Sequence, residues 1–114
     1  MGLDDISEYS AETSIGRIRV RLMNLENGLL ILLSDKENYR LGLSAVAIPP
    51  GHGSSNPTST GLFTVGLENE LVRTMAERVA MWTNQTCLIV VGLHQMNREI
   101  MMELLTALKD YLLT

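Results

Sequence analysis

The alternation of apolar and polar residues predicts a run of β-strands in the first half of the chain. The segment GRIRVRLM, at residues 16–23, alternates strictly between apolar side chains and arginines before its final methionine. A period of two is typical of a strand with one buried face and one face open to solvent or to a partner. Short turn sequences separate it from two further apolar strands at 28–34 and 39–48. Because only short loops join these three strands, we expect an antiparallel meander.

Beyond the middle of the chain, the hydrophobic period changes from that of a strand to that of a helix. A loop rich in proline, glycine and serine, 49–60, precedes a fourth strand at 61–67. Two amphipathic helices follow, separated by a fifth strand at 87–93. The order β-β-β-β-α-β-α predicts an α+β fold, an antiparallel β-sheet with both helices on one face. The predicted buried stripes of the helices are Leu71, Val72, Met75, Ala76, Val79 and Ala80, and then Met96, Ile100, Leu104, Leu108 and Tyr111 or Leu112.

Three of the predicted strands, 28–34, 41–48 and 87–93, are apolar on both faces. Strands of this kind are normally covered on both sides. Two helices cover only one face of a five-stranded sheet, so we expect the other face to pack on the sheet of a second copy or of a related chain. Exposed leucines on an uncovered face are the alternative. The candidate residues of this dimer interface are Leu30, Ile31, Leu32, Val46, Ile89 and Val91.

The net charge of −4 lies entirely near the N-terminus. Residues 1–12 hold four of the 13 acidic residues, which leaves nine acids beside all nine bases in 13–114. We expect 1–12 to be a disordered acidic tail and 13–114 to form a single domain. A neutral body argues against binding nucleic acid, and no apolar run reaches the ~20 residues that span a membrane. The single cysteine, Cys87, indicates a reduced, cytoplasmic protein, with the nucleus as an additional compartment.

The residue types that carry enzyme chemistry form no recognisable motif in this sequence. The loop 49–60 lacks the GK[ST] ending of a phosphate-binding loop and leads into a strand. His52 and His94 are the only histidines, too few beside one cysteine for a zinc site. Cys87 and His94 stand at opposite ends of one predicted strand, ~20 Å apart, so they do not form a nucleophile pair. We expect no catalytic residues, no metal and no cofactor, and an enzyme that uses the loop is the least supported interpretation.

Residues 58–93, TSTGLFTVGLENELVRTMAERVAMWTNQTCLIVVGL, resemble the second half of the small proteasome-assembly chaperones of the third and fourth types. The shared features are an apolar strand, a helix with a short acidic start, a TN turn and a very apolar strand. The likeness extends over 15–112 as a pattern of elements. It implies a non-catalytic protein that pairs sheet on sheet, with itself or a paralogue, and holds α-type subunits of the 20S proteasome while the α-ring forms. The C-terminal DYLLT departs from the hydrophobic-Tyr-any-residue tail by which some proteasome-binding proteins dock.

Two surfaces are candidates for contact with a proteasome α-subunit. One is the arginine side of 16–23, for which a solvated edge strand is the alternative explanation. The other is the polar and methionine-bearing side of the first helix, where adaptable apolar surface suits a partner. The alternative function is a regulatory adaptor of longin or roadblock type that scaffolds a GTPase complex, although a roadblock domain begins with a helix. The candidate partner-binding residues are Arg17, Arg19, Arg21, Glu70, Arg73, Glu77 and Met81.

Overall fold

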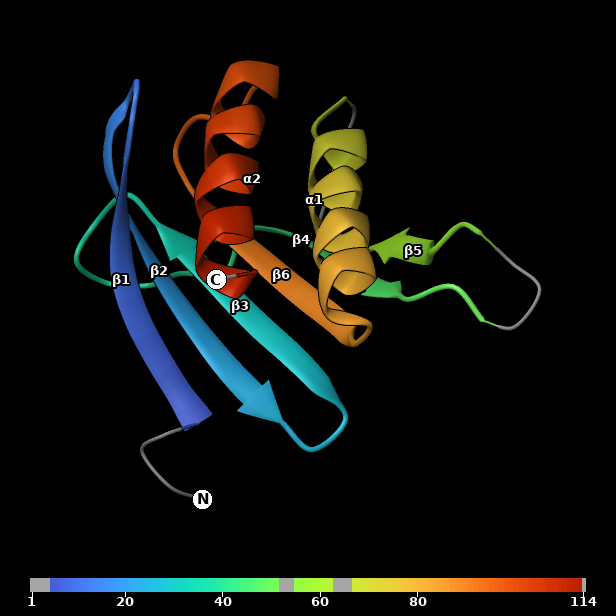
Figure 1. Cartoon of the computed structure of the whole chain (residues 1–114). Coiled ribbons are helices and arrows are strands. Elements are labelled where there is room, and N and C mark those ends of the chain that lie inside the picture. The colour runs from blue at the N-terminus through green and yellow to red at the C-terminus, as the bar shows by residue number, and fades with distance from the viewer. Residues whose placement is uncertain (1–4, 52–54, 63–66, 114) are drawn as a thin grey trace.

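Both helices lie on the same face of one β-sheet (Figure 1). The computed structural model describes residues 5–51, 55–62 and 67–113, and within these ranges the sheet has six strands. The α+β fold predicted from the sequence is confirmed, with one additional strand at the start. In chain order the elements are β1 (Ile6–Thr13), β2 (Gly16–Leu25), β3 (Gly28–Ser34), β4 (Leu43–Ile48), β5 (Thr58–Gly61), α1 (Leu67–Thr83), β6 (Thr86–Gly92) and α2 (Arg98–Leu112).

The sheet is mixed, whereas the sequence predicted a purely antiparallel one. The strand order is β1-β2-β3-β6-β4-β5, and β6 runs parallel to β3 and antiparallel to β4. Helix α1 packs on β4, β5 and β6, so it carries the chain back across the sheet between β5 and β6. Strands β5 and β6 run in the same direction with β4 between them, and a helical crossover is the usual connection between strands of the same direction. The last strand therefore enters the middle of the sheet and does not extend its edge.

The prediction of a disordered tail at 1–12 is wrong for residues 6–12, which belong to strand β1. This strand pairs with β2 along its whole length, from Ile6 opposite Met23 to Thr13 opposite Gly16. The acidic composition concealed an alternating pattern, in which Tyr9 and Ala11 face the helices and Glu8, Ser10 and Glu12 face away. Gly16 has a φ of +111°, a conformation that glycine adopts readily, so it suits the tight turn between the two strands. Residues 1–4 lie outside the described residues.

Two other predicted strands are displaced along the chain. The strand predicted at 39–48 begins only at Leu43, because residues 39–42 are irregular. The strand predicted at 61–67 is found as β5 at 58–61, within the segment predicted as a loop. Residues 63–66 lie outside the described residues, and Leu67 already belongs to α1. The turn-forming residues of the sequence thus predicted the ends of these two strands only to within a few positions.

The core lies between the sheet and the two helices, and its helical stripes match the predicted ones. Every predicted position of α1 is fully buried except Leu71, which is partly buried. In α2 the last contact with the core comes from Leu112, while Tyr111 is 40% exposed. No helix among the described residues is long and apolar enough to cross a lipid bilayer. The strand residues of this core are Ile18, Val20, Leu22, Leu29, Ile31, Leu33, Ala45, Ala47, Cys87, Ile89 and Val91.

Candidate functional site

A pocket of about 480 Å³ lies between α1 and the N-terminal half of α2. The two helices begin at the same end of the molecule and run side by side over the sheet (Figure 1). Asn97 determines where α2 begins, because its side chain caps the helix by accepting a hydrogen bond of 2.9 Å from the backbone N–H of Ile100. The residues that line this helix pocket are Glu68, Glu70, Leu71, Thr74, Arg78, Met96, Asn97, Arg98, Met101 and Met102.

Apolar side chains form the floor and one flank of the helix pocket. Met96 and Met101 are buried at its base, Leu71 is partly buried, and Met102 is 51% exposed at the rim. Methionine thioethers are flexible and make favourable contacts with aromatic rings. The pocket therefore suits a flat, largely apolar ligand.

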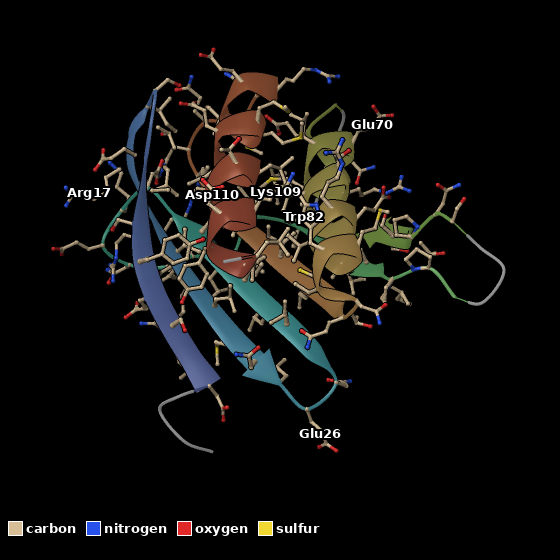
Figure 2. The ribbon with its side chains drawn as sticks, in the orientation of Figure 1. Arg17, Glu26, Glu70, Trp82, Lys109 and Asp110 are labelled. Carbon is tan, nitrogen blue, oxygen red and sulfur yellow. The ribbon has the colours of Figure 1, made fainter. Side chains whose placement is uncertain are left out.

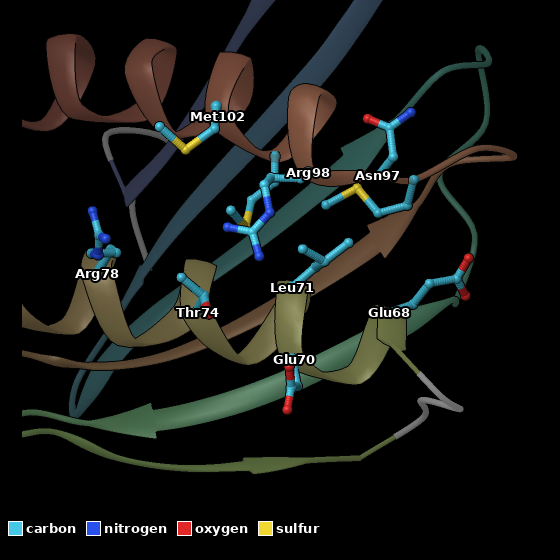
Figure 3. Close-up of a pocket in the computed structure, with 10 residues that line it drawn as sticks. Glu68, Glu70, Leu71, Thr74, Arg78, Asn97, Arg98 and Met102 are labelled. Carbon is cyan, nitrogen blue, oxygen red and sulfur yellow. The ribbon is translucent and has the colours of Figure 1, made fainter.

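Two arginines line the helix pocket, one from each helix. Figure 3 shows Arg98 reaching from the first turn of α2 toward α1, with Arg78 farther along α1 beyond Thr74. Within the described residues, neither Arg78 nor Arg98 has an ion pair or a hydrogen bond. Glu70 points away from α2 in the same view. Both guanidinium groups are thus available to a ligand.

A second, smaller pocket of about 290 Å³ adjoins the first and shares Glu68 and Met96 with it. One wall of this second pocket is formed where the segment before β4 lies close against the end of β6. A Cβ atom at Gly42 would lie 2.5 Å from the carbonyl oxygen of Val91, so only glycine fits there. Arg40 holds the same junction, because its guanidinium donates hydrogen bonds to the carbonyls of Gly92 and Leu93 at 3.3 and 3.2 Å.

His94 lines the second pocket and pairs with Asp35. The backbone N–H of His94 donates to Asp35 at 2.9 Å, and its Nδ1 lies 2.9 Å from the other carboxylate oxygen. Burial opposes ionisation of Asp35, but the hydrogen bonds and charge of His94 outweigh it and hold the pKa of that carboxyl below its usual value. The pair joins the loop after β3 to the loop after β6.

The predicted arginine surface is present, but its charges are already paired within the chain. Arg17 lies 3.0 Å from Glu12, while Arg19 and Arg21 lie 3.5 and 2.8 Å from Glu8. Arg19 and Arg21 also stack over the ring of Tyr39, at 5.1 and 4.9 Å from its centroid. The acids of β1 were missed as partners because β1 itself was not predicted.

The four candidate partner-binding residues of α1 do not share one environment in the structure. Arg73 donates to the hydroxyl of Ser59 at 3.0 Å, and that hydroxyl also bonds Glu77, so these two residues anchor β5 to the helix. Met81 is 49% exposed, and Glu70 borders the helix pocket. In Figure 2 Arg17 and Glu70 lie on opposite sides of the molecule. The seven candidate residues therefore do not form one continuous surface.

The predicted dimer interface needs a correction, because its six residues lie on two different faces. Ile31, Ile89 and Val91 are at most 1% exposed, since they lie under the helices. They cannot contact a partner without unfolding the chain. The open face is the side of the sheet opposite the helices, and among the described residues no helix covers it. Its partly exposed apolar residues are Met23, Leu30, Leu32, Val46 and Leu88.

The residue types considered for nucleophilic or metal chemistry are dispersed. Cys87 is buried in the core, and burial raises the pKa of its thiol to about 12. Within the described residues, no group of three or more His, Cys, Asp or Glu side chains is placed to hold a metal ion. His52 lies outside these residues.

The fold and the pockets define a small α+β domain with one open sheet face and a ligand-sized pocket between its helices. The family model described as "Prenylated flavin chaperone LpdD-like domain" matches residues 12–112. The chain therefore belongs to this family.

A solved structure titled "Crystal Structure of a Novel Chaperone Complex for Yeast 20S Proteasome Assembly" has a similar fold. The TM-score is 0.68 at 16% sequence identity, and the match covers 95% of each chain. None of the curated proteins matches the chain. The resemblance to proteasome-assembly chaperones thus predicted the fold correctly, whereas the family is a different one.

Proposed function

We propose that this protein is a non-catalytic chaperone that holds a prenylated flavin in the helix pocket and delivers it to another protein. The observation that carries the proposal is a pocket of about 480 Å³ with methionine walls in a chain of the prenylated flavin chaperone LpdD-like family. The likeness in fold to a component of a chaperone complex supports a role in handling another molecule. The flavin is cargo in this proposal and not a resident catalytic cofactor.

The chemistry of the pocket fits such a cargo. A flavin has a flat aromatic ring system, and a prenyl substituent adds further apolar surface. Leu71, Met96 and Met101 present aliphatic and thioether surface to a ligand between the helices. Small-molecule sites are commonly concave, mainly apolar and marked by a few polar groups. Arg78 and Arg98 are such groups.

Anaerobic equilibrium dialysis of the whole chain against a prenylated flavin tests the proposal. We expect saturable binding of one flavin per chain. Met102→Trp should lower the affinity by about tenfold or more, because an indole at the rim fills the pocket. Met81→Trp is the matched control, because Met81 is equally exposed on a helix but lies outside the pocket lining. The proposal is wrong if the wild type retains no flavin, or if both variants bind like the wild type.

We also propose that the chain is a dimer whose two open faces pack on each other. The leucines at 30, 32 and 88 form a continuous apolar patch across β3 and β6, flanked by Met23 and Val46. Solvent-exposed apolar surface of this kind is normally covered by a partner. The paired arginines beside the patch, with Glu8, would form a polar rim around it.

A second candidate function is to hold α-type subunits of the 20S proteasome during assembly of the α-ring. Only the likeness in fold favours it. Pull-down with purified α-type subunits distinguishes this function from that of a flavin carrier, because a flavin carrier retains none of the subunits. If an α-subunit is captured, reversing Arg17, Arg19 and Arg21 to Glu tests the arginine surface, and Glu77→Lys with Met81→Asp tests α1. Capture that both variants retain at wild-type affinity would exclude the two surfaces.

A further inference from the structure

The two arginines of the helix pocket come from different helices and have no partner among the residues that the structure describes. Arg78 lies on the fourth turn of α1, and Arg98 is the first residue of α2. Elsewhere the arginines are engaged: those of β2 pair with acids of β1, Arg73 bonds β5, and Arg40 bonds the end of β6. Within the described residues, Arg78 and Arg98 have no such bond. Stability of the fold does not explain why they face one pocket.

The charges of the pocket are separated along its length. Arg78 lies at one end and Glu68 at the other, next to the second pocket, while Arg98 reaches into the space between the helices (Figure 3). An anionic group would therefore be attracted to the space beside Arg78 and Arg98 and repelled by Glu68.

We infer that Arg78 and Arg98 together bind the phosphate of a prenylated flavin nucleotide, so that the protein selects the phosphorylated form of its cargo. This inference rests on the proposed function. Arginine is suited to phosphate because its planar fork of N–H donors makes charge-assisted hydrogen bonds. Thr74 lies between the two arginines along the helix pocket and supplies a neutral hydroxyl.

This placement also orients the rest of the ligand. With the phosphate between the arginines, the ring system lies over Leu71 and Met101 and points toward Met96. Met96 is shared with the second pocket, which extends the apolar floor to Leu93 beside His94. The ring end of the cargo would then lie near the carboxyl ends of the parallel strands β3 and β6, a common place for ligands in sheets of this kind.

The test compares a prenylated flavin mononucleotide with the same compound after removal of its phosphate. Binding of each to the wild type, to R78Q, to R98Q and to the double variant is measured by anaerobic dialysis. We expect the wild type to prefer the phosphorylated form by about tenfold or more, the scale of one hydrogen bond to a charged group. Each arginine variant should lose most of that preference while binding the dephosphorylated form within about twofold of the wild type. Added salt should reduce the preference of the wild type only.

R17Q is the matched control, because Arg17 is an exposed arginine paired with Glu12 outside the pocket. It should keep the wild-type preference, and far-ultraviolet circular dichroism should show the same fold for every variant. Equal binding of both forms by the wild type, or a preference that survives in the double variant, overturns this inference and leaves the proposed function standing. Failure of the wild type to bind either form overturns both.

Discussion

The rings of Tyr9 and Tyr111 stack with their centroids 4.2 Å apart and an angle of 8° between their planes. Tyr9 belongs to the edge strand β1, and Tyr111 to the last turn of α2. In the second turn of the same helix, Glu103 accepts hydrogen bonds from the backbone N–H and the hydroxyl of Ser14, at 2.9 and 2.7 Å. Contacts from α2 thus hold β1 and its turn against the rest of the molecule.

Tyr111→Ala should destabilise the protein by about 1 kcal/mol or more, because an aromatic pair contributes beyond the area that it buries. Burial, with a smaller contribution from Tyr111, raises the pKa of Tyr9 well above its ordinary value, so that its hydroxyl stays neutral. That hydroxyl is buried and has no hydrogen-bond partner in the described part of the chain. Tyr9→Phe should therefore leave stability unchanged or raise it. Urea denaturation measures both, and a loss of stability in Tyr9→Phe as large as in Tyr111→Ala would contradict this account.

Because Asp35 pairs with His94, the free energy of unfolding should depend on pH. The pKa of Asp35 in the folded chain lies below its value in the unfolded chain, which is about 3.9. The unfolded state then binds more protons between these two values, so the stabilisation is present above the unfolded pKa and is lost as the pH falls through the folded one.

Asp35→Asn should accordingly remove part of the difference in unfolding free energy between pH 6 and pH 3. Asp110→Asn is the control, because Asp110 is an exposed aspartate near the end of α2. Urea denaturation at several pH values gives the comparison. Equal pH profiles for Asp35→Asn and the wild type would show that the pair is not coupled to folding.

Cys87 should be inert toward thiol reagents in the native protein. Burial raises the pKa of its thiol to about 12, and the thiolate is the reactive form. At pH 8 the native chain should react at least about a hundredfold more slowly than the chain in denaturant, where the pKa returns to about 8.5. Met81→Cys in the same assay supplies an exposed thiol for comparison. A native rate equal to that of the exposed thiol would refute the burial of Cys87.

Leu30→Asp and Ile31→Asp should fail in different ways, although the two residues are adjacent. Leu30 lies on the open face, so its substitution should leave a folded chain that no longer dimerises. Ile31 is fully buried under the helices, so an aspartate there should unfold the chain itself. Light scattering measures the first effect and circular dichroism the second. If the wild type has a mass of only 12.6 kDa at tens of micromolar, the proposed dimer is wrong.

The sequence by itself determined the local elements and which side of each faces the core. The period of two in 16–23 placed Ile18, Val20 and Leu22 inside, and the helical period placed Met75, Val79 and Leu104 inside. These assignments depend on neighbouring residues only, because side-chain direction follows the geometry of the strand or helix. Strands that are apolar on both sides, by contrast, carry no period, so the sequence could not separate Leu30 from Ile31.

Only the tertiary structure decided which distant segments meet. Nothing local places β6 between β3 and β4, or joins the acids of β1 to the arginines of β2. The helix pocket arises in the same way, because Arg78 and Arg98 belong to separate helices that lie side by side only when both pack on one sheet. A pocket is a property of the gap between packed elements, and the relative position of those elements is set by long-range packing, which no single stretch of sequence encodes.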